Sequence, residues 1–294
     1  MRYLLILVLA FSCAAGRVSA KVYSATGLVL QVDRAKRSIE ISCDVIPGYM
    51  DAMVMTFAVR KVEALDALKP GMTIAFQLAV EKDAAYADNI HVRQYENTAQ
   101  EPMATRQLEI LDSATQAPAE TEDGQSPLQV GQFVPNFSLV DQRGANFRLA
   151  SLAGEVVAIT FIYTRCPLPN FCFRMSNNFG VVHRRFADRM GKDVALLSIT
   201  FDPEHDQPAV LAEYARTFTK DETGWYFLTG PPADVQKICR SFGVNAWQDE
   251  GLLTHPLHTV VLDRHQSIVA NIEGNEFTAK QLGDLIESVI DRPN

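Results

Sequence analysis

Two cysteines separated by five residues are the strongest chemical feature of the sequence. Cys166 and Cys172 follow an apolar run typical of a buried strand and precede a segment with helical spacing. A thiol at the start of a helix lies near the positive end of the helix dipole, and Arg165 adds a positive charge. At least one thiol should therefore have a lowered pKa and act as a thiolate, which is both a nucleophile and a ligand for soft metal ions.

The segment between the two cysteines decides whether their sulfur atoms can meet. On an ideal helix, residues at this spacing would lie about 9 Å apart, whereas a disulfide needs Cα atoms within about 7 Å. Pro167 and Pro169 disfavour a helix here, so the segment must fold back if Cys166 and Cys172 act together. The alternative is two separate structural cysteines, for which a proline-rich loop is a poor location.

A second group of sulfur side chains occurs near the start of the chain. Met53 and Met55 alternate along an expected strand, so their thioethers share a face. Cys43 and Met50 lie close by in the sequence, and soft sulfur ligands favour Cu(I) over harder ions. All four side chains could instead fill an apolar core, because apolar residues alternate through both segments. Three methionines within six residues favour the ligand interpretation.

Two histidines precede the expected strand at 259–262. His255 and His258 are three residues apart, so only one of them can face the cysteine loop if the strand is regular. The other histidines are expected at surface or turn positions; they are His91, His183, His205 and His265. Cys239 lies in a helical pattern and is expected to be a small buried core residue.

Asp202 and Asp206 follow an expected buried strand at 194–200. They lie where loops of an α/β fold approach the active edge of the sheet. Asp206 could support the cysteine loop, or it could be a turn or N-cap residue before a helix that begins near Pro208. Both interpretations remain open from the sequence.

The secondary-structure pattern divides the chain into two domains. Residues 21–97 contain five short strand patterns separated by turns, which predicts a small all-β barrel of the oligonucleotide/oligosaccharide-binding type. Residues 98–127 are rich in Ala, Glu, Thr, Gln and Pro and predict a linker, so the two domains should move independently. Residues 128–294 alternate strands and helices and end in a hairpin and a helix, which predicts an α/β thioredoxin-like fold.

The first twenty residues have the charged, apolar and small-residue order of a secretory signal peptide. We expect cleavage after Ala20 and a periplasmic or otherwise exported protein; membrane attachment would follow only if Cys13 were lipidated. The formal net charge is −8 and no Lys/Arg-rich run is present, which argues against a nucleic-acid partner.

Residues 131–291 resemble the Sco/SenC family of exported thioredoxin-fold proteins that carry copper to cytochrome c oxidase. The resemblance lies in residues 131–137, in 161–166, and in 198–203 with Asp206. It implies that Cys166, Cys172 and His255 bind copper, with His258 as the alternative third ligand. The family pair has three intervening residues, whereas this chain has five.

Residues 25–92 resemble the periplasmic copper-binding domain of the CusF type. The matching run is 41–55, in which Cys43, Met53 and Met55 take the places of a histidine and two methionines that bind copper. Met50 takes the place of a tryptophan that caps the metal, which leaves an all-sulfur set.

Together the resemblances imply a copper chaperone, handling Cu(I) or Cu(II), whose partner is the copper-receiving subunit of a respiratory oxidase. One alternative is a thiol–disulfide oxidoreductase that keeps the oxidase cysteines reduced with Cys166 and Cys172 and is itself served by a thioredoxin-like reductant. Another is a general periplasmic copper-homeostasis protein. The sequence favours a metallochaperone over an enzyme without excluding the redox activity.

Overall fold

The structure is a computed structural model. It describes residues 21–82, 84–93, 126–244, 247–249, 252–254 and 256–292. The expected signal peptide with Cys13, most of the expected linker, and His255 lie outside the described residues.

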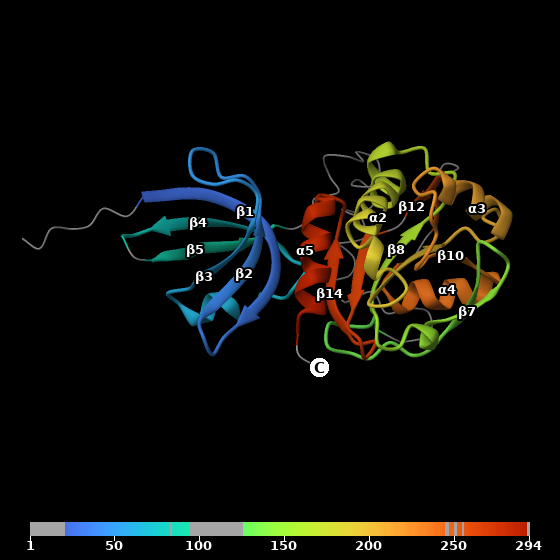
Figure 1. Ribbon diagram of the computed structural model, residues 1–294, viewed down its shortest axis with the longest axis horizontal. Helices are drawn as coiled ribbons and strands as arrows, with labels where there is room; N and C mark the ends of the chain where they lie inside the picture. Colours follow the sequence, from blue (N-terminus) through green and yellow to red (C-terminus); the bar gives the residue numbers. More distant parts are fainter. Residues whose placement is uncertain are drawn as a thin grey trace, which may run out of the picture.

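Five strands of the N-terminal domain close into a barrel in the order β1-β2-β3-β5-β4 (Figure 1). Their bounds are β1 (Lys21–Asp33), β2 (Ser38–Cys43), β3 (Val54–Ala58), β4 (Thr73–Val80) and β5 (Ala85–Val92). The barrel is antiparallel except where β3 meets β5 in parallel. Alternate residues of β2 point inward, so Ile39, Ile41 and Cys43 are buried in the barrel core. A single 3-10 turn, Val62–Leu65, connects β3 to β4.

The C-terminal domain contains a sheet with the strand order β14-β13-β8-β9-β10-β6-β7. The strands are β6 (Ser138–Asp141), β7 (Asn146–Arg148), β8 (Val156–Ile162), β9 (Val194–Thr200), β10 (Trp225–Thr229), β13 (His258–Leu262) and β14 (Ile268–Glu273). The helices are α2 (Arg174–Arg185), α3 (Pro208–Arg216), α4 (Pro232–Ser241) and α5 (Ala279–Ile290). A separate ribbon pairs β11 (Trp247–Asp249) with β12 (Leu252–Thr254).

Helices cover both faces of this sheet. Strands β8, β9 and β10 run parallel to one another, and each crossover between neighbours contains one helix. Right-handed crossovers place α2 and α3 on the same face, where α5 packs against α2. Helix α4 lies on the opposite face, as the contact between the Phe161 and Phe242 rings shows. The loops that follow β8 and β9 therefore meet at one edge of the sheet.

The two domains share an extensive interface along α5 (Figure 1). Leu28 and Leu30 of β1 are buried in the apolar core of the C-terminal domain. The Arg292 guanidinium, just beyond α5, donates a hydrogen bond of 3.2 Å to the carbonyl of Leu30. Gly71, with φ +91°, lies so close to β14 that a Cβ there would be 3.1 Å from the Asn271 carbonyl oxygen. The expectation that the domains move independently is thus wrong.

One expected surface histidine is also buried. His183 lies on α2, its Nε2 atom is 2.9 Å from the carbonyl oxygen of Thr223, and its ring is 5.6 Å from that of Trp225. It shares a helix face with Phe179 and Phe186, so the helical period already indicated its burial. Cys239 is buried in the core as expected. No helix among the described residues is long and apolar enough to cross a membrane.

Candidate functional site

The loop between β8 and α2 brings Cys166 and Cys172 together. After Tyr163 the chain leaves the sheet, and it folds back at Phe171, whose backbone (φ −106, ψ −112) is not helical. Cys166 is half-buried and Cys172 is buried, and both are free thiols that lie close enough to shift each other's pKa. The fold-back that the prolines require therefore makes the two cysteines one unit.

The contact between the thiols separates their acidities. The hydrogen bond from Cys172, aided by contacts with backbone groups and with Tyr163, lowers the pKa of Cys166 to about 6 despite its partial burial. The same contact and burial raise the pKa of Cys172 well above its ordinary value. At neutral pH the pair thus holds one thiolate and one thiol, a nucleophile beside a proton donor.

Two aspartates from the loop after β9 hold the residues that lead into Cys166. The buried Asp206 carboxylate accepts hydrogen bonds from the Thr164 N–H (3.1 Å), the Thr164 hydroxyl (2.6 Å) and the Thr200 hydroxyl (2.6 Å). The Asp202 carboxylate accepts two hydrogen bonds from the Arg165 guanidinium, at 2.7 and 3.1 Å. The Arg165 charge is thus paired with Asp202, and the low pKa of Cys166 comes from hydrogen bonds instead.

This arrangement decides the role of Asp206. The N-cap residue of α3 is Gln207, whose side chain makes no capping hydrogen bond. Asp206 instead points at the cysteine loop and supports it. Burial raises the pKa of the Asp206 carboxyl, against the three hydrogen bonds that stabilise its ionised form.

Tyr214 of α3 is an additional neighbour of the pair that the sequence did not reveal. Its hydroxyl lies 2.9 Å from that of Ser176 on α2. Burial, together with the negative charge of the nearby cysteines, raises the pKa of Tyr214, so the phenol remains neutral. The spacing of Tyr214 from Leu211 and Phe218 on one helix face indicated burial but gave no sign of the cysteines.

His258 lies at the start of β13, at the same edge of the sheet as the cysteine loop. Its ring Nδ1 is 3.1 Å from Oδ1 of Asn271, and burial lowers its pKa, so the imidazole is neutral near pH 7. Its Nε2 lies near Gly243 at the end of α4, whereas the next residue, Thr259, contacts Met175 on the opposite face. Within the described part of the chain, no group of three His, Cys, Asp or Glu side chains forms a metal cluster.

The sulfur side chains of the barrel lie at one end of β2 and β3. Cys43 is buried, and its N–H donates to the Met53 carbonyl at 2.9 Å. Met55 pairs with Ile41 in the ladder, so Met53, Met55 and Cys43 share the inward face of neighbouring strands. Met55 and Met50 are half-buried, but Met53 is 45% exposed. A pure core role therefore does not account for Met53.

The Cys43 thiol is held in its neutral form when no metal is bound. Burial, with a smaller effect from the Asp44 carboxylate, raises its pKa to about 12, while Lys280 of α5 acts in the opposite direction. A metal ion that binds Cys43 must displace this proton.

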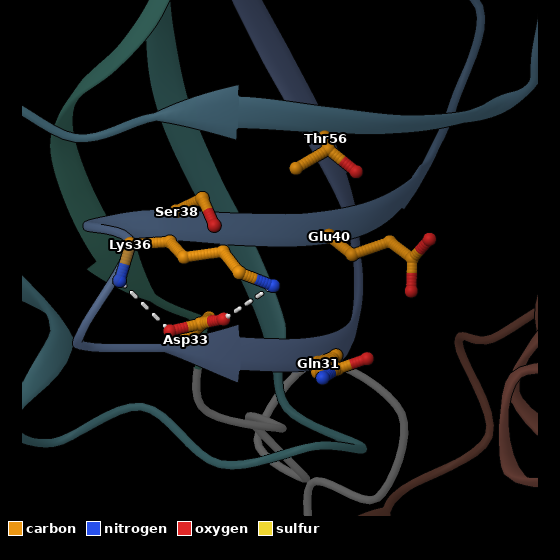
Figure 2. A pocket seen from close by; sticks show the side chains of 6 residues that line it. All are labelled: Gln31, Asp33, Lys36, Ser38, Glu40 and Thr56. Atoms are coloured by element: carbon orange, nitrogen blue, oxygen red, sulfur yellow. Dashed lines mark hydrogen bonds and ion pairs between the residues drawn. The ribbon is translucent and has the colours of Figure 1, made fainter. Parts of the chain in front are cut away.

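A pocket on the outside of the barrel is unrelated to the sulfur cluster (Figure 2). It is lined by Gln31, Asp33, Lys36, Ser38, Glu40 and Thr56. Lys36 pairs with Asp33 through its ammonium group at 3.3 Å and its backbone N–H at 2.9 Å. The lining contains no sulfur or imidazole, so it offers no site for a soft metal ion.

The fold and the paired thiols define a thioredoxin-like protein with a reactive cysteine loop, joined to a small β-barrel. The SCO1/SenC family model matches residues 125–291, more than half of the chain, and the chain belongs to that family. A second family model, described as the copper-binding periplasmic protein CusF, matches residues 22–91.

Individual relatives match the C-terminal domain. A SCO2-like protein of Rickettsia typhi is 26% identical over 161 residues, which cover 52% of this chain and 75% of the relative. The SCO1 protein homolog of Bacillus subtilis is 34% identical over 98 residues, covering 33% of this chain and 49% of the relative. The crystal structure of a SCO1/SenC family lipoprotein from Bacillus anthracis is 22% identical with a TM-score of 0.50, and covers 55% of this chain and 96% of that one. This structural likeness confirms the thioredoxin-like fold.

Proposed function

We propose that this chain is an exported copper-binding protein that delivers Cu(I) for assembly of the copper centre of a respiratory cytochrome c oxidase. The observation that carries the proposal is the contact between the Cys166 and Cys172 thiols in a loop held by Asp206 and Asp202. A thiolate beside a second thiol gives Cu(I) two soft ligands once the second proton is lost. Membership in the SCO1/SenC family supports copper as the cargo.

The third ligand of this site is His258, at the start of β13, or His255, which lies outside the described residues. His258 has a neutral imidazole at the edge of the sheet that carries the cysteine loop. Its Nδ1 lies next to Asn271, which leaves Nε2 for a metal. Nε2 faces Gly243 at the end of α4, so the His258 side chain must turn toward the cysteine loop to bind the same ion. His255 is the alternative ligand, and replacing each histidine by Ala distinguishes them.

The barrel is proposed as a second Cu(I) site, formed by Cys43, Met53 and Met55 with Met50 beside them. The match to a copper-binding periplasmic family supports this proposal and the exported location. The strand order, with β3 parallel to β5, supports a barrel of the oligonucleotide/oligosaccharide-binding type. An all-sulfur ligand set favours Cu(I).

A competitive Cu(I) titration of the reduced full chain tests the function. Two ions should bind per chain, and Cys166→Ser or Cys172→Ser should each remove one of them. Cys239→Ala is the matched control, because Cys239 is a buried core residue of α4 and belongs to neither sulfur cluster. Full stoichiometry in Cys166→Ser and Cys172→Ser would contradict the proposal.

A thiol–disulfide oxidoreductase is the second candidate, favoured by the low pKa of Cys166. In that reaction the Cys166 thiolate attacks a disulfide of the oxidase subunit and one partner sulfur leaves as a thiolate. Cys172 then displaces the second partner sulfur, so the partner is reduced and Cys166 and Cys172 become a disulfide. Incubation of the reduced chain with an oxidised peptide from the copper site of the oxidase, with and without Cu(I), separates the two functions. A reductase reduces the disulfide of the peptide without copper. A chaperone transfers Cu(I) only to a peptide that is already reduced.

A further inference from the structure

We infer that the barrel and the Cys166/Cys172 pair exchange Cu(I) within one chain, and that the interface along α5 is built for this exchange. The inference rests on the proposed function, because it requires that both sulfur clusters bind Cu(I). It adds a partner for the cysteine pair, namely the barrel of the same chain.

Helix α5 forms hydrogen bonds with the barrel residues on both sides of Cys43. The Ser42 hydroxyl donates to the Asp284 carboxylate at 2.6 Å, and both side chains are buried. The Gln281 amide donates to the Asp44 carboxylate at 3.1 Å and to the Ser42 carbonyl at 3.4 Å. Helix α5 of one domain therefore holds the backbone that carries the candidate ligand of the other.

The segment just before α5 forms hydrogen bonds with the cysteine loop and with the start of α2. The Asn275 amide donates to the carbonyl of Asn170, which lies between the two cysteines, at 2.6 Å. The Arg174 guanidinium donates to the Glu276 carbonyl at 3.4 Å. The Glu276 carboxylate also forms an ion pair of 3.3 Å with Arg93 of the barrel domain. Residues 275–284 thus contact the surroundings of both sulfur clusters.

The two clusters lie toward the same end of α5. In Figure 1 the loop that joins β2 to β3 and the start of α2 both lie toward the upper edge, on opposite sides of α5, which begins at that edge. Each cluster has a sulfur-bearing residue that solvent reaches: Met53 of the barrel is 45% exposed, and Cys166 of the pair is half-buried. These sulfurs offer the positions at which an incoming ligand can replace a departing one.

The exchange needs no oxidant or reductant, because copper stays Cu(I) throughout. Bonds from copper to the sulfurs of Cys43, Met53 and Met55 break, and bonds to the sulfurs of Cys166 and Cys172 form. Any thiol proton that Cys166 or Cys172 still carries is released, Cys43 takes one up, and the buffer takes up any remainder. Two thiolates replace one thiolate and two neutral thioethers, which favours transfer from the barrel to the pair.

Dependence on protein concentration tests the exchange. Mild oxidation first joins Cys166 and Cys172 of the full chain in a disulfide, one equivalent of Cu(I) is added to fill the barrel, and a phosphine then reduces the disulfide. Mass spectrometry after alkylation reports when Cys166 and Cys172 are released as thiols and when copper protects them. Within one chain, the half-time of protection should not change over a hundredfold range of protein concentration.

Two full-length variants provide the reference for transfer between molecules. The donor carries Cys166→Ser and Cys172→Ser and is loaded with Cu(I); the acceptor carries Cys43→Ser, Met53→Leu and Met55→Leu. Their mixture should transfer copper at a rate that rises with concentration, because the two must collide. A wild-type rate that rises in the same way would overturn the inference.

Weakening the interface gives an independent measurement. Ser42→Ala with Gln281→Ala should slow transfer tenfold or more, while Ser38→Ala with Gln31→Ala on the outer face of the barrel (Figure 2) should leave it unchanged. Equal rates in the two double variants, or faster transfer in the first, would also overturn the inference. If the donor or the acceptor variant binds no Cu(I), the proposed function itself fails, which separates the two results.

Discussion

Replacing Cys172 by Ala should raise the pKa of Cys166, because the Cys172 thiol is the main reason that this pKa is low. With a pKa of about 6, roughly nine tenths of Cys166 is thiolate at pH 7. If removal of the donor returns the pKa toward the ordinary thiol value of about 8.5, that fraction falls to roughly a few per cent. A more basic thiolate is intrinsically more reactive, by roughly tenfold at a Brønsted coefficient of 0.4–0.5, so the rate of Cys166 alkylation by iodoacetamide at pH 7 should change much less than the thiolate fraction. The shift in pKa should instead appear in the pH at which the alkylation rate reaches half its maximum.

The assay is the rate of Cys166 alkylation between pH 5 and pH 10, followed by mass spectrometry of the peptide that contains it. The midpoint in the unaltered chain is expected near pH 6 and in Cys172→Ala well above it. Cys239→Ala should keep the original midpoint, because Cys239 is a buried thiol that does not contribute to the lowered pKa of Cys166. A midpoint near pH 6 in Cys172→Ala would refute the idea that the Cys172 thiol sets the acidity.

Three further results are expected. Asp206→Ala should lower the free energy of unfolding by about 2–4 kcal/mol in urea denaturation, because it leaves the Thr164 and Thr200 donors without their acceptor; a loss below 1 kcal/mol would contradict this role. The free energy of unfolding of the reduced, metal-free chain should also rise as the pH increases from about 6 toward 9. The reason is that the pKa of Cys166 is lower in the folded state than in the unfolded state, so the folded chain loses its proton first and the stabilisation disappears as the pH falls through the folded-state pKa of about 6. The slope should be smaller in Cys166→Ser. Met53→Leu with Met55→Leu should weaken Cu(I) binding by the barrel at least tenfold in a competitive titration while changing stability by less than about 1.5 kcal/mol, and unchanged affinity would assign both methionines to packing.

The elements that the sequence predicted well are those whose hydrophobic period is unambiguous. Strand β9 has the expected bounds, Val194–Thr200, because both faces are buried and the apolar run is continuous. The hairpin of β6 and β7 was missed, since strands of four and three residues are too short to show a period. The same limit applies to the ribbon of β11 and β12.

The cysteine pair was predicted as a unit, but the cause of its acidity was not. The sequence placed Arg165 beside Cys166, whereas the charge that pairs with Arg165 comes from Asp202, thirty-seven residues away. Likewise, an aspartate at position 206 fits two roles: an N-cap for the following helix, or an acceptor of hydrogen bonds from the cysteine loop. The sequence therefore cannot distinguish these roles of Asp206. Only the three-dimensional arrangement of Thr164 and Thr200 around that carboxylate distinguishes the two roles.

The interface between the domains was not predictable from local pattern. Ser42 lies 242 positions from Asp284, and no periodic pattern connects such residues. The linker composition even favoured independent domains, because a polar connection says nothing about the surfaces that it joins. Leu28 and Leu30 were assigned to the barrel, yet their side chains belong to the core of the other domain.

The burial of Leu28 and Leu30 bears on what remains after the chain is cut. A protease that cleaves between the domains would leave two fragments whose apolar surfaces still cover each other, so the nicked protein should migrate as a single species until it is denatured. A barrel produced alone would instead expose those leucines to water, and the α5 surface of an isolated C-terminal fragment would lose its cover. Each fragment would therefore be prone to self-association, and the stable folded unit of this protein is the pair of domains and not either domain alone.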